Sequence, residues 1–300
     1  MSTTAVGLVT GAWRRHFAVR LDDGRTITCV LRGRSLGVAC GDRVRFDLTA
    51  DGAGAITAIE PRGTVLFRSD AYRQKLLAAN VTQVLGIVAP VPPYDDELVQ
   101  RWIIAAESNA CRFALIANKR DLPGFAALEP RLAACRELGY PVVPLHAQGG
   151  PIDLAPVRDL VAGQRSLLVG QSGMGKSTLI NALIPGAQAR VGEVSEALGA
   201  GRHTTSETTL YTLDAQSWMI DSPGMKEFGL AHLSAAAIAQ GFVDLRPFVG
   251  HCRFRDCRHD VEPGCAVRDA VARGAVKPWR LALLHRLLAE REGPPRARSR

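Results

Sequence analysis

Residues 170–177 read Gly-Gln-Ser-Gly-Met-Gly-Lys-Ser, a spacing that suits the binding of phosphate groups. Glycines let backbone N–H groups curl around phosphate oxygens, and the following helix adds the positive end of its dipole. Lys176 would pair with β- and γ-phosphate oxygens, and Ser177 would ligate Mg²⁺. A glycine-rich turn without a ligand is the alternative, but the strand-to-helix context favours a phosphate site. The candidate residues are Gly170, Gln171, Ser172, Gly173, Met174, Gly175, Lys176, Ser177 and Thr178.

A second candidate loop follows the apolar stretch 113–117 and consists of Asn118, Lys119, Arg120 and Asp121. The Asp121 carboxylate can accept two hydrogen bonds from the N1–H and the N2 amino group of guanine, a donor pair that adenine does not offer. Leaving such donors unpaired is costly, so a site of this kind would reject ATP. Four residues alone are a weak match, but together with the phosphate loop they predict a guanine nucleotide site.

Lysine is rare in this chain, which has 37 Lys and Arg residues, only five of them Lys. Two of the five, Lys119 and Lys176, stand where a guanine nucleotide site requires an ammonium group. A planar guanidinium does not replace a compact ammonium at phosphates, so this usage supports both loops.

The switch motifs of such a site are also present. Residues 221–224, Asp-Ser-Pro-Gly, follow the apolar stretch 218–220, which places Asp221 at a strand end to hold the Mg²⁺ shell and Gly224 next to the γ-phosphate. Residues 201–205, Gly-Arg-His-Thr-Thr, form a polar stretch that suits the other switch. The predicted Mg²⁺ ligands are Ser177, Thr205 and Asp221.

The order of the motifs is unusual. In an ordinary GTPase the base-reading loop follows the phosphate and switch motifs, whereas here Asn118 precedes Gly170 by 52 residues. The chain is therefore predicted to be circularly permuted, a rearrangement that keeps the sheet and moves the termini to surface loops. The switch that ends near Gly224 is then followed almost directly by the C-terminal region. A change of the bound nucleotide is therefore expected to reposition that region.

The catalytic group differs from that of Ras-like enzymes. Position 225, after Asp-Ser-Pro-Gly, is Met, where those enzymes carry the glutamine that orients the attacking water. Intrinsic hydrolysis is therefore expected to be slow. His203, in the candidate switch, is the nearest polar substitute and the predicted catalytic residue, and a structural role for it is the alternative.

Four potential metal ligands crowd within fourteen residues. Cys252, Cys257, His259 and Cys265 offer three thiolates and one imidazole, a complete tetrahedral shell without an open position. This donor set predicts one structural Zn²⁺ per chain; reduced free thiols and a role for His251 are the weaker alternatives. The scattered cysteines are expected to be buried small hydrophobes: Cys29, Cys40, Cys111 and Cys135.

The elements that would position these groups fall into three regions. The first 60 residues alternate apolar and polar with period two between turn signals, which predicts a small five-stranded OB-fold barrel. From about residue 80, apolar strands alternate with helical stretches, which indicates a parallel sheet covered by helices. The predicted fold is therefore α/β, with an OB-fold barrel at 1–65, a circularly permuted P-loop GTPase domain at 66–235 and a helical zinc-binding domain with a basic tail at 236–300.

The charge distribution points to a polyanionic partner. The formal net charge is +8, with +3 on residues 1–65 and +6 on residues 241–300, so two basic ends flank a nearly neutral middle. Nucleic acid fits this distribution, although surface solvation by arginine is the alternative. The barrel offers Trp13 or Phe17 for stacking on bases, with a purely structural barrel as the equal alternative, and its phosphate-contact candidates are Arg14, Arg15, Arg32, Arg34, Arg43 and Arg45.

The N-terminal residues lack a basic start and an apolar core, and no stretch approaches the roughly 18 apolar residues of a membrane span. We therefore expect a cytoplasmic protein without a membrane partner. A monomer is the default expectation for its oligomeric state.

Taken jointly and in this order, the motifs resemble those of the RsgA (YjeQ) family of circularly permuted GTPases that depend on the small ribosomal subunit. The resemblance rests on Gly-Asp-Arg-Val (41–44), Ala-Asn-Val (79–81), Asn-Lys-Arg-Asp-Leu (118–122), Gly-Gln-Ser-Gly-Met-Gly-Lys-Ser (170–177), Gly-Arg-His-Thr-Thr (201–205), Asp-Ser-Pro-Gly (221–224) and Cys-Arg-Phe-Arg-Asp-Cys-Arg-His (252–259).

This resemblance implies a GTPase that the small ribosomal subunit stimulates, a role in late subunit maturation, rRNA contacts through the barrel and the zinc domain, and a catalytic histidine at His203. The chain departs from the family at Ser206, at His146-Ala147 where Ser-Ala is usual, and at Pro278-Trp279-Arg280 where an Arg-Tyr pattern is usual. Two alternative hypotheses are a pseudo-GTPase that keeps GTP as a structural ligand, and a P-loop kinase or ATPase. Asp121 disfavours the second one.

Overall fold

The computed structural model describes most of the chain, and its described residues are 4–13, 15–32, 37–50, 52–69, 74–187, 189, 208–221 and 228–292. The chain forms two compact units. The first comprises Met1–Phe67, Leu76–Tyr94 and Arg112–Lys226, and the second comprises Arg68–Lys75, Asp95–Cys111 and Glu227–Arg300. The domain boundaries at 65/66 and 235/236 stay predictions.

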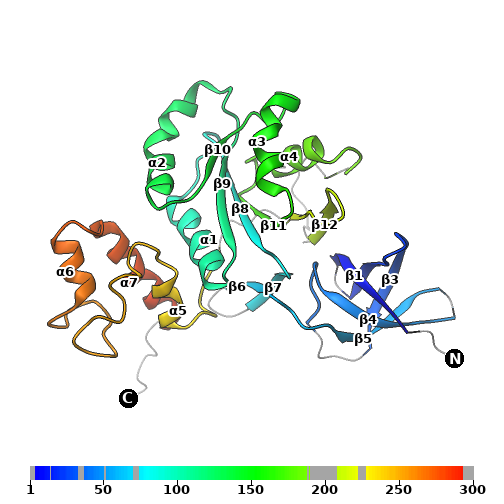
Figure 1. Cartoon of the computed structure of the whole chain (residues 1–300), viewed down its shortest axis with the longest axis horizontal. Coiled ribbons are helices and arrows are strands. Elements are labelled where there is room, and N and C mark those ends of the chain that lie inside the picture. Colours follow the sequence, from blue (N-terminus) through cyan, green and yellow to red (C-terminus); the bar gives the residue numbers. More distant parts are fainter. Residues whose placement is uncertain are drawn as a thin grey trace, which may run out of the picture. The chain divides into compact units, whose positions relative to one another are not determined.

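The first unit begins with a closed five-stranded barrel (Figure 1). Its strands pair in the order β1-β2-β3-β5-β4, and a further antiparallel pairing of β1 with β4 closes the ring. All pairings are antiparallel except that of β3 with β5. This arrangement confirms the predicted OB-fold. The strands are β1 Thr4–Trp13, β2 His16–Arg20, β3 Thr26–Leu31, β4 Arg43–Leu48 and β5 Gly54–Ile59.

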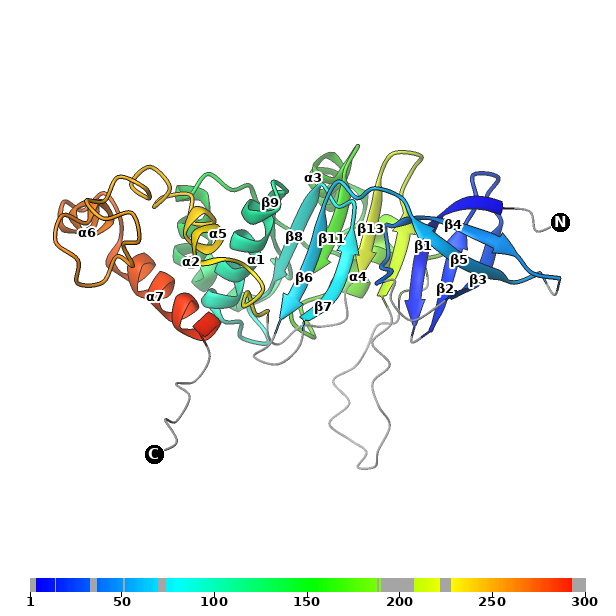
Figure 2. The same ribbon diagram turned by 90° about the horizontal axis from the view of Figure 1, so that it is seen from below.

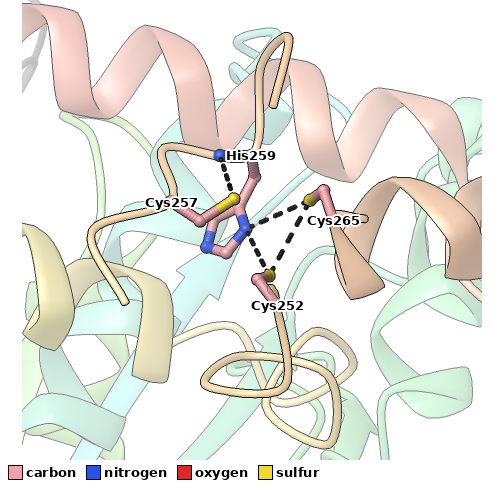
Figure 3. Close-up of side chains that lie close together, drawn as sticks. All are labelled: Cys252, Cys257, His259 and Cys265. Carbon is pink, nitrogen blue, oxygen red and sulfur yellow. Dashed lines mark hydrogen bonds between the residues drawn. The ribbon is translucent and has the colours of Figure 1, made fainter. Parts of the chain in front are cut away.

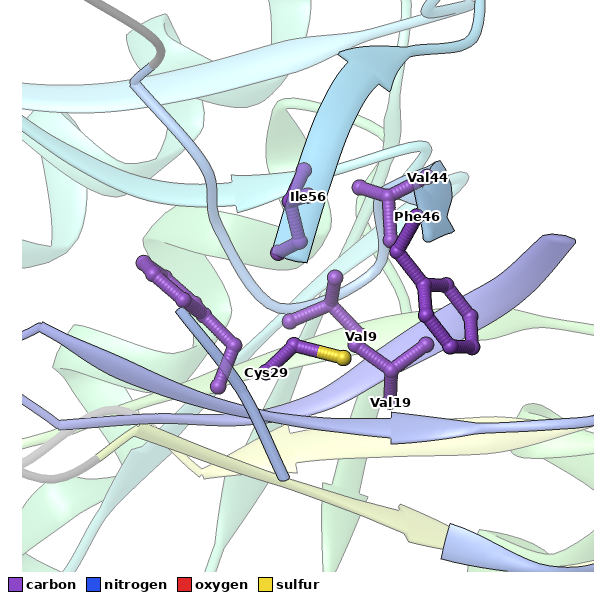
Figure 4. Close-up of a cluster of buried hydrophobic side chains, with 7 residues drawn as sticks. Val9, Val19, Cys29, Val44, Phe46 and Ile56 are labelled. Carbon is purple, nitrogen blue, oxygen red and sulfur yellow. The ribbon is translucent and has the colours of Figure 1, made fainter. Parts of the chain in front are cut away.

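The period-two pattern builds the core of the barrel. Alternate side chains point inward from each strand, because successive residues of a strand face opposite sides of a sheet. Seven of them pack together at the centre: Val9, Phe17, Val19, Cys29, Val44, Phe46 and Ile56 (Figure 4). None of the seven is more than 5% exposed. Phe17 is therefore a core residue, which agrees with the structural alternative and contradicts its use for stacking on bases.

The second part of the first unit is an α/β layer. Strand β8 Gln83–Val88 is buried at every position, as expected for a strand of a parallel sheet that is covered on both faces. Helices α3 and α4 lie on one face of this sheet and α2 on the other (Figure 1). The remaining elements are β9 Arg112–Ala117, the 3₁₀ helix η1 Pro123–Leu128, α2 Glu129–Glu137, β10 Val142–Pro144, α3 Pro151–Val161, β11 Arg165–Val169, α4 Lys176–Leu183, β12 Thr208–Thr212 and β13 Trp218–Asp221.

The strand order shows the permutation directly. Strand β11, which leads into the phosphate loop, lies between β8 and β13, and the order across the layer is β10-β9-β8-β11-β13-β12. Strands β8 to β11 and β13 run parallel, and only β12 is antiparallel to its neighbour β13. The chain thus builds β8 and β9 before β11 and β13. The predicted α/β layer with parallel strands behind an OB-fold barrel is confirmed.

Barrel and layer share one continuous eleven-stranded sheet (Figure 2). Strand β1 pairs with β12 through Gly11 opposite Thr209 and Ala12 opposite Thr208. The Sγ of Cys40 lies 3.1 Å from the carbonyl oxygen of Thr208. A separate two-stranded sheet of β6 Val65–Ser69 and β7 Gln74–Ala79 follows the barrel in the chain.

The second unit is helical. Helix α1 begins after Asp95, whose side chain caps it by accepting a hydrogen bond of 2.9 Å from the backbone N–H of Glu97. The long C-terminal helix is α7 Pro278–Glu292. The other helices are α1 Asp96–Ser108, α5 Ala235–Gln240 and α6 Ala266–Ala272. None of the helices in the described ranges is long and apolar enough to cross a membrane.

Candidate functional site

The phosphate loop occupies the turn between β11 and α4. Two glycines are required by geometry. A Cβ on Gly170 would lie 2.7 Å from the carbonyl oxygen of Ile87, and Gly175, with φ +99°, would bring a Cβ to 2.2 Å from the side-chain nitrogen of Asn118. Ser177 and Thr178 follow in the first turn of α4 and are half-buried, whereas Ser172 is exposed. The sequence therefore folds as a phosphate loop requires, with glycine wherever the backbone has no room for a side chain.

Lys176 lies inside this loop. Its side chain folds back so that Nζ donates to the carbonyl oxygens of Gly170 at 2.7 Å and Gln171 at 3.1 Å. Only 8% of the residue is exposed. Burial lowers the pKa of its ammonium group, and the charge of Asp221 partly offsets this effect. A buried ammonium held by backbone carbonyls is ready to exchange one of them for a phosphate oxygen.

Asn118 connects the two loops that the sequence singled out. Its Nδ2 donates to the carbonyl oxygen of Met174 in the phosphate loop at 2.9 Å, and its Oδ1 accepts from the backbone N–H of Ala147 at 3.2 Å. The residue is 3% exposed. The buried side-chain amide of Asn118 thus links its own loop to the phosphate loop and to the loop after β10.

The rest of the base-reading loop is fixed around Asn118. Lys119 adopts a left-handed conformation with φ +60°, and its Nζ donates to the carbonyl oxygen of Val91 at 2.7 Å. Arg120 forms an ion pair with Asp153 at the start of α3. Asp121 stays partly exposed, and Nε2 of His146 lies 3.7 Å from its Oδ1.

Asp221 ends β13, as predicted. Burial raises the pKa of its carboxyl group to about 6, and the neighbouring ammonium of Lys176 opposes this increase. Its Oδ1 is buried and has no hydrogen-bond partner among the described residues. A buried carboxylate oxygen without a partner fits a ligand of a hard cation such as Mg²⁺, directly or through water. Thr205, His203 and Gly224 lie outside the described residues.

The four predicted zinc ligands meet in the second unit (Figure 3). Their donor atoms all lie within 4.8 Å of one another. Nδ1 of His259 is 3.5 Å from Sγ of Cys252 and 3.4 Å from Sγ of Cys265, and these two sulfur atoms are 3.9 Å apart. In tetrahedral zinc sites with Zn–S near 2.3 Å and Zn–N near 2.0–2.1 Å, the ligand–ligand edges are about 3.8 Å for S–S and about 3.6 Å for S–N. The three edges that join Cys252, His259 and Cys265 fit such a shell.

Local structure holds these ligands in place. Cys265 is the N-cap of α6, where its Sγ accepts from the N–H of Arg268 at 3.4 Å. His259 has φ +64°, unusual for a residue other than glycine, and its carbonyl oxygen lies 3.0 Å from Nε2 of His285. Burial lowers the pKa of His259, which favours the neutral imidazole that a metal requires.

Glu262 is a residue that the sequence interpretation missed. Its carboxylate accepts from the backbone N–H groups of Arg258 at 2.8 Å and Asp260 at 2.9 Å, and these hydrogen bonds lower its pKa to about 2. They close the turn that carries His259. The sequence could have indicated Glu262 only through its position between the candidate metal ligands His259 and Cys265. An acidic residue in a loop is usually just exposed to solvent.

The candidate RNA-contacting arginines of the barrel are exposed and paired. Arg32 forms an ion pair with Asp47, Arg43 with Asp22, and Arg45 with Glu60. Exposed pairs of this kind are worth little and can exchange for phosphate. Trp13 is half-buried, Arg15 is exposed, and Arg14 and Arg34 lie outside the described residues.

Arg280 behaves differently from a surface arginine. It is 1% exposed, it makes a bidentate ion pair with Asp244 at 2.7 to 3.1 Å, and its Nη1 donates to Gln100 at 2.5 Å. Its guanidinium also lies 4.5 Å from the ring centre of Phe242. Arg280 is therefore part of the core of the second unit and is not available to RNA.

A phosphate loop on β11, a base-reading loop on β9 and an acidic strand end on β13 define a P-loop GTPase, here with its motifs in permuted order. A profile of the family described as RsgA GTPase matches residues 59–231. The chain belongs to this family of GTP hydrolases.

Curated relatives match over nearly the whole chain. A protein from Nitrosospira multiformis is 47% identical over 94% of this chain and 90% of its own length, and one from Nitrosomonas europaea is 45% identical over 95% and 91%. Both carry the name small ribosomal subunit biogenesis GTPase RsgA.

Solved structures agree with the fold. YjeQ from Thermotoga maritima aligns with a TM-score of 0.73 at 25% identity, covering 97% of this chain and 100% of that chain. YloQ, described as a circularly permuted GTPase, aligns with a TM-score of 0.67 at 20% identity, covering 98% of each chain.

Proposed function

We propose that this GTPase is a nucleotide switch in late maturation of the small ribosomal subunit, and that subunit binding stimulates its hydrolysis of GTP. The names of the relatives from Nitrosospira multiformis and Nitrosomonas europaea support this role, since both describe biogenesis of that subunit. The basic residues at both ends of the chain suit rRNA as the partner. Such a role places the protein in the cytoplasm, and we propose that it acts as a monomer.

One observation carries the nucleotide site: Asn118 is hydrogen-bonded to the phosphate loop through Met174 and to the loop after β10 through Ala147. A buried amide with both ends paired across three loops has a low tolerance for displacement. The geometry supports GTP and GDP binding by residues 118–121 together with 170–178.

Each residue has a separate task in this proposal. The Asp121 carboxylate accepts from the guanine N1–H and N2 groups, and backbone N–H groups of residues 170–175 surround the phosphates. Lys176 leaves the carbonyl oxygens of Gly170 and Gln171 to pair with β- and γ-phosphate oxygens. Ser177, Thr205 and Asp221 would hold Mg²⁺, which supplies neutralisation of the charge that develops on the phosphate oxygens.

We assign the orientation of the attacking water to His203, since Met225 has no group that could do so. Without a glutamine at that place, hydrolysis by the free protein is slow, and subunit binding is the event that positions the switch histidine. His203→Ala should then lower the stimulated rate more than the affinity for GTP. Equal stimulated rates in the two proteins would remove the histidine from the mechanism.

The flanking regions hold the RNA in this proposal. The exposed arginines of the barrel exchange their carboxylate partners for phosphates, and the zinc domain supplies the second basic surface. Cys252, Cys257, His259 and Cys265 would hold one Zn²⁺ per chain, which would supply a fixed crosslink between these parts of a short segment.

The first experiment is GTP hydrolysis by the purified protein with and without purified small ribosomal subunits. A slow basal rate that rises sharply only with small subunits is the expected result. Large subunits at the same concentration are the control, because they offer rRNA without the proposed binding site. An unchanged rate would instead favour a pseudo-GTPase that keeps GTP as a structural ligand.

A second experiment tests the base and phosphate assignments. Excess ATP should not displace labelled GTP, because adenine offers no donor pair to Asp121; strong displacement would indicate a P-loop kinase or ATPase. Lys176→Ala should abolish nucleotide binding, and wild-type GTP affinity in that variant would refute the role of the phosphate loop.

A further inference from the structure

The residue beside Asp121 is unusual for its position. The loop after β10 begins Leu145-His146-Ala147, and it places an imidazole next to the carboxylate that would read guanine. Nε2 of His146 lies 3.7 Å from Oδ1 of Asp121, and both side chains are partly exposed, 34% and 44% respectively. The pair is therefore open to solvent and to an incoming base.

Backbone hydrogen bonds fix this pair. The N–H of Leu145 donates to the carbonyl oxygen of Ala117 at 2.7 Å, and the N–H of Arg120 donates to the carbonyl oxygen of Leu145 at 3.0 Å. The Asn118 side chain holds Ala147, and the N–H of Gly149 closes a turn on the carbonyl oxygen of His146 at 2.9 Å. These hydrogen bonds hold the main chain on both sides of Asp121 and of His146. The fold therefore keeps the two side chains close together.

The other charged groups on these elements already have partners. Lys119 donates to the carbonyl oxygen of Val91, and Arg120 pairs with Asp153 at the start of α3. Lys176 points into the phosphate loop. His146 is thus the cationic candidate on these loops that can act on the Asp121 carboxylate.

We propose that protonated His146 competes with guanine for the Asp121 carboxylate. The inference rests on the proposed nucleotide site. At 3.7 Å the two side chains lie within ion-pair distance but beyond hydrogen-bond distance, so a neutral imidazole leaves the carboxylate to the base. A protonated imidazole forms a full ion pair with the free carboxylate, which guanine binding must weaken.

The consequence is a pH dependence of nucleotide affinity. Histidine is the side chain whose charge ordinarily changes between about pH 5 and 8. Exposed ion pairs are weak, so protonation of His146 should cause about a two- to fivefold loss of affinity for GDP. The affinity of the wild-type protein should therefore fall by this factor from pH 7.5 to 5.5, beyond any decrease that the site shows without the histidine.

The test compares GDP affinity over pH 5.5 to 7.5 in wild-type protein, His146→Gln and His146→Ser, all without polyhistidine tags and in EDTA. Gln keeps an N–H donor but does not titrate, so His146→Gln should keep the affinity at pH 7.5 and lose the extra decrease. His16→Gln, on an exposed barrel residue, is the control that should keep the wild-type profile. Titration of Asp221 is common to all four proteins and cancels in the comparison.

Parallel pH profiles in wild-type protein and either His146 variant would overturn the proposal. Should both variants fail to bind, His146→Asn, which does not titrate either, takes their place in the same comparison of pH profiles. A complete lack of GDP binding by wild-type protein at every pH would instead refute the nucleotide site, and the inference with it.

Discussion

The side-chain amide of Asn118 donates to the carbonyl oxygen of Met174 over 2.9 Å, which joins two loops 56 residues apart in the chain. The same amide accepts from Ala147, so its removal leaves two buried backbone groups without partners. Leaving a buried group unpaired costs about 1–3 kcal/mol. Asn118→Ala should therefore weaken GDP binding by about ten- to a hundredfold.

The control is Asn109→Ala. Asn109 also donates its side-chain amide to a backbone carbonyl, that of Ala105 at 2.8 Å, but at the end of α1 in the second unit. Fluorescence titration with a labelled GDP would measure both variants. Similar affinities in Asn118→Ala and Asn109→Ala would contradict the bridging role.

Asp221 should make the nucleotide-free protein sensitive to pH. Burial raises the pKa of its carboxyl group to about 6, so the folded state favours the protonated form. The contribution of this group to the free energy of unfolding is full below its ordinary pKa near 4 and is lost as the pH rises through about 6. At pH 7.5 and without nucleotide or Mg²⁺, Asp221→Asn should therefore be more stable than the wild-type protein.

Thermal unfolding at pH 5 and pH 7.5 measures this difference. The advantage of Asp221→Asn should be larger at pH 7.5, and Mg²⁺ with GTP should reverse the order, because only the carboxylate can ligate the cation. An advantage that is equal at both pH values would argue against a buried, strained carboxylate.

The zinc cluster should be testable by metal content. Cys265→Ser removes one of four ligands and the capping thiolate of α6, so bound zinc should fall from about one per chain to near zero. Cys135→Ser, at a buried cysteine outside the cluster, is the control and should keep its zinc. Elemental analysis with a thermal melt measures both variants, and a fully folded metal-free wild-type protein would refute the zinc assignment.

Local motifs explain why the geometry of the candidate nucleotide site could be predicted. The positions of Lys176 and Gly175 follow from residues nearby in the chain, since this loop is one turn between a strand and a helix. The barrel followed from period-two alternation. The cluster of potential metal ligands was predictable because Cys252 to Cys265 lie within fourteen residues.

Contacts between distant segments were not predictable in this way. Phe17 alternates with polar residues whether it faces the core or an RNA base, and only closure of the barrel by β1 and β4 decides that it faces the core. The neighbourhood of His146 and Asp121 depends on the parallel pairing of β9 with β10. Arg280 looks like a surface residue of an amphipathic helix until Asp244 and Gln100 approach from other segments.

Arg280→Ala should destabilise the second unit strongly. The substitution leaves the carboxylate of Asp244 without its bidentate partner, and breaking a buried pair from one side costs about 3–5 kcal/mol. Arg286→Ala is the control, because the pair of Arg286 with Glu97 is exposed and worth at most about 1 kcal/mol. Chemical unfolding would measure both, and equal effects would contradict the burial of Arg280.

The barrel should depend on a glycine that touches the next segment of the chain. Gly41 has φ +91°, and a Cβ there would lie 2.1 Å from the carbonyl oxygen of Ala79, which follows the barrel in the chain. Gly24 has nearly the same backbone angle, φ +88°, with open space around it. Gly24→Ala therefore measures the conformational cost alone, about 1 kcal/mol, whereas Gly41→Ala adds a steric clash with backbone.

Three hydrogen bonds surround this contact and explain why it cannot relax. The N–H of Ala79 donates to the carbonyl oxygen of Cys40 at 3.0 Å, that of Gly41 to Val9 at 2.9 Å, and the side chain of Asn80 donates to the carbonyl oxygen of Gly41 at 2.9 Å. We expect Gly41→Ala to lower the free energy of unfolding by at least about 2 kcal/mol more than Gly24→Ala. Equal losses in the two variants, measured by urea unfolding, would show that the backbone angle alone requires glycine and that the close approach of Ala79 has no energetic weight.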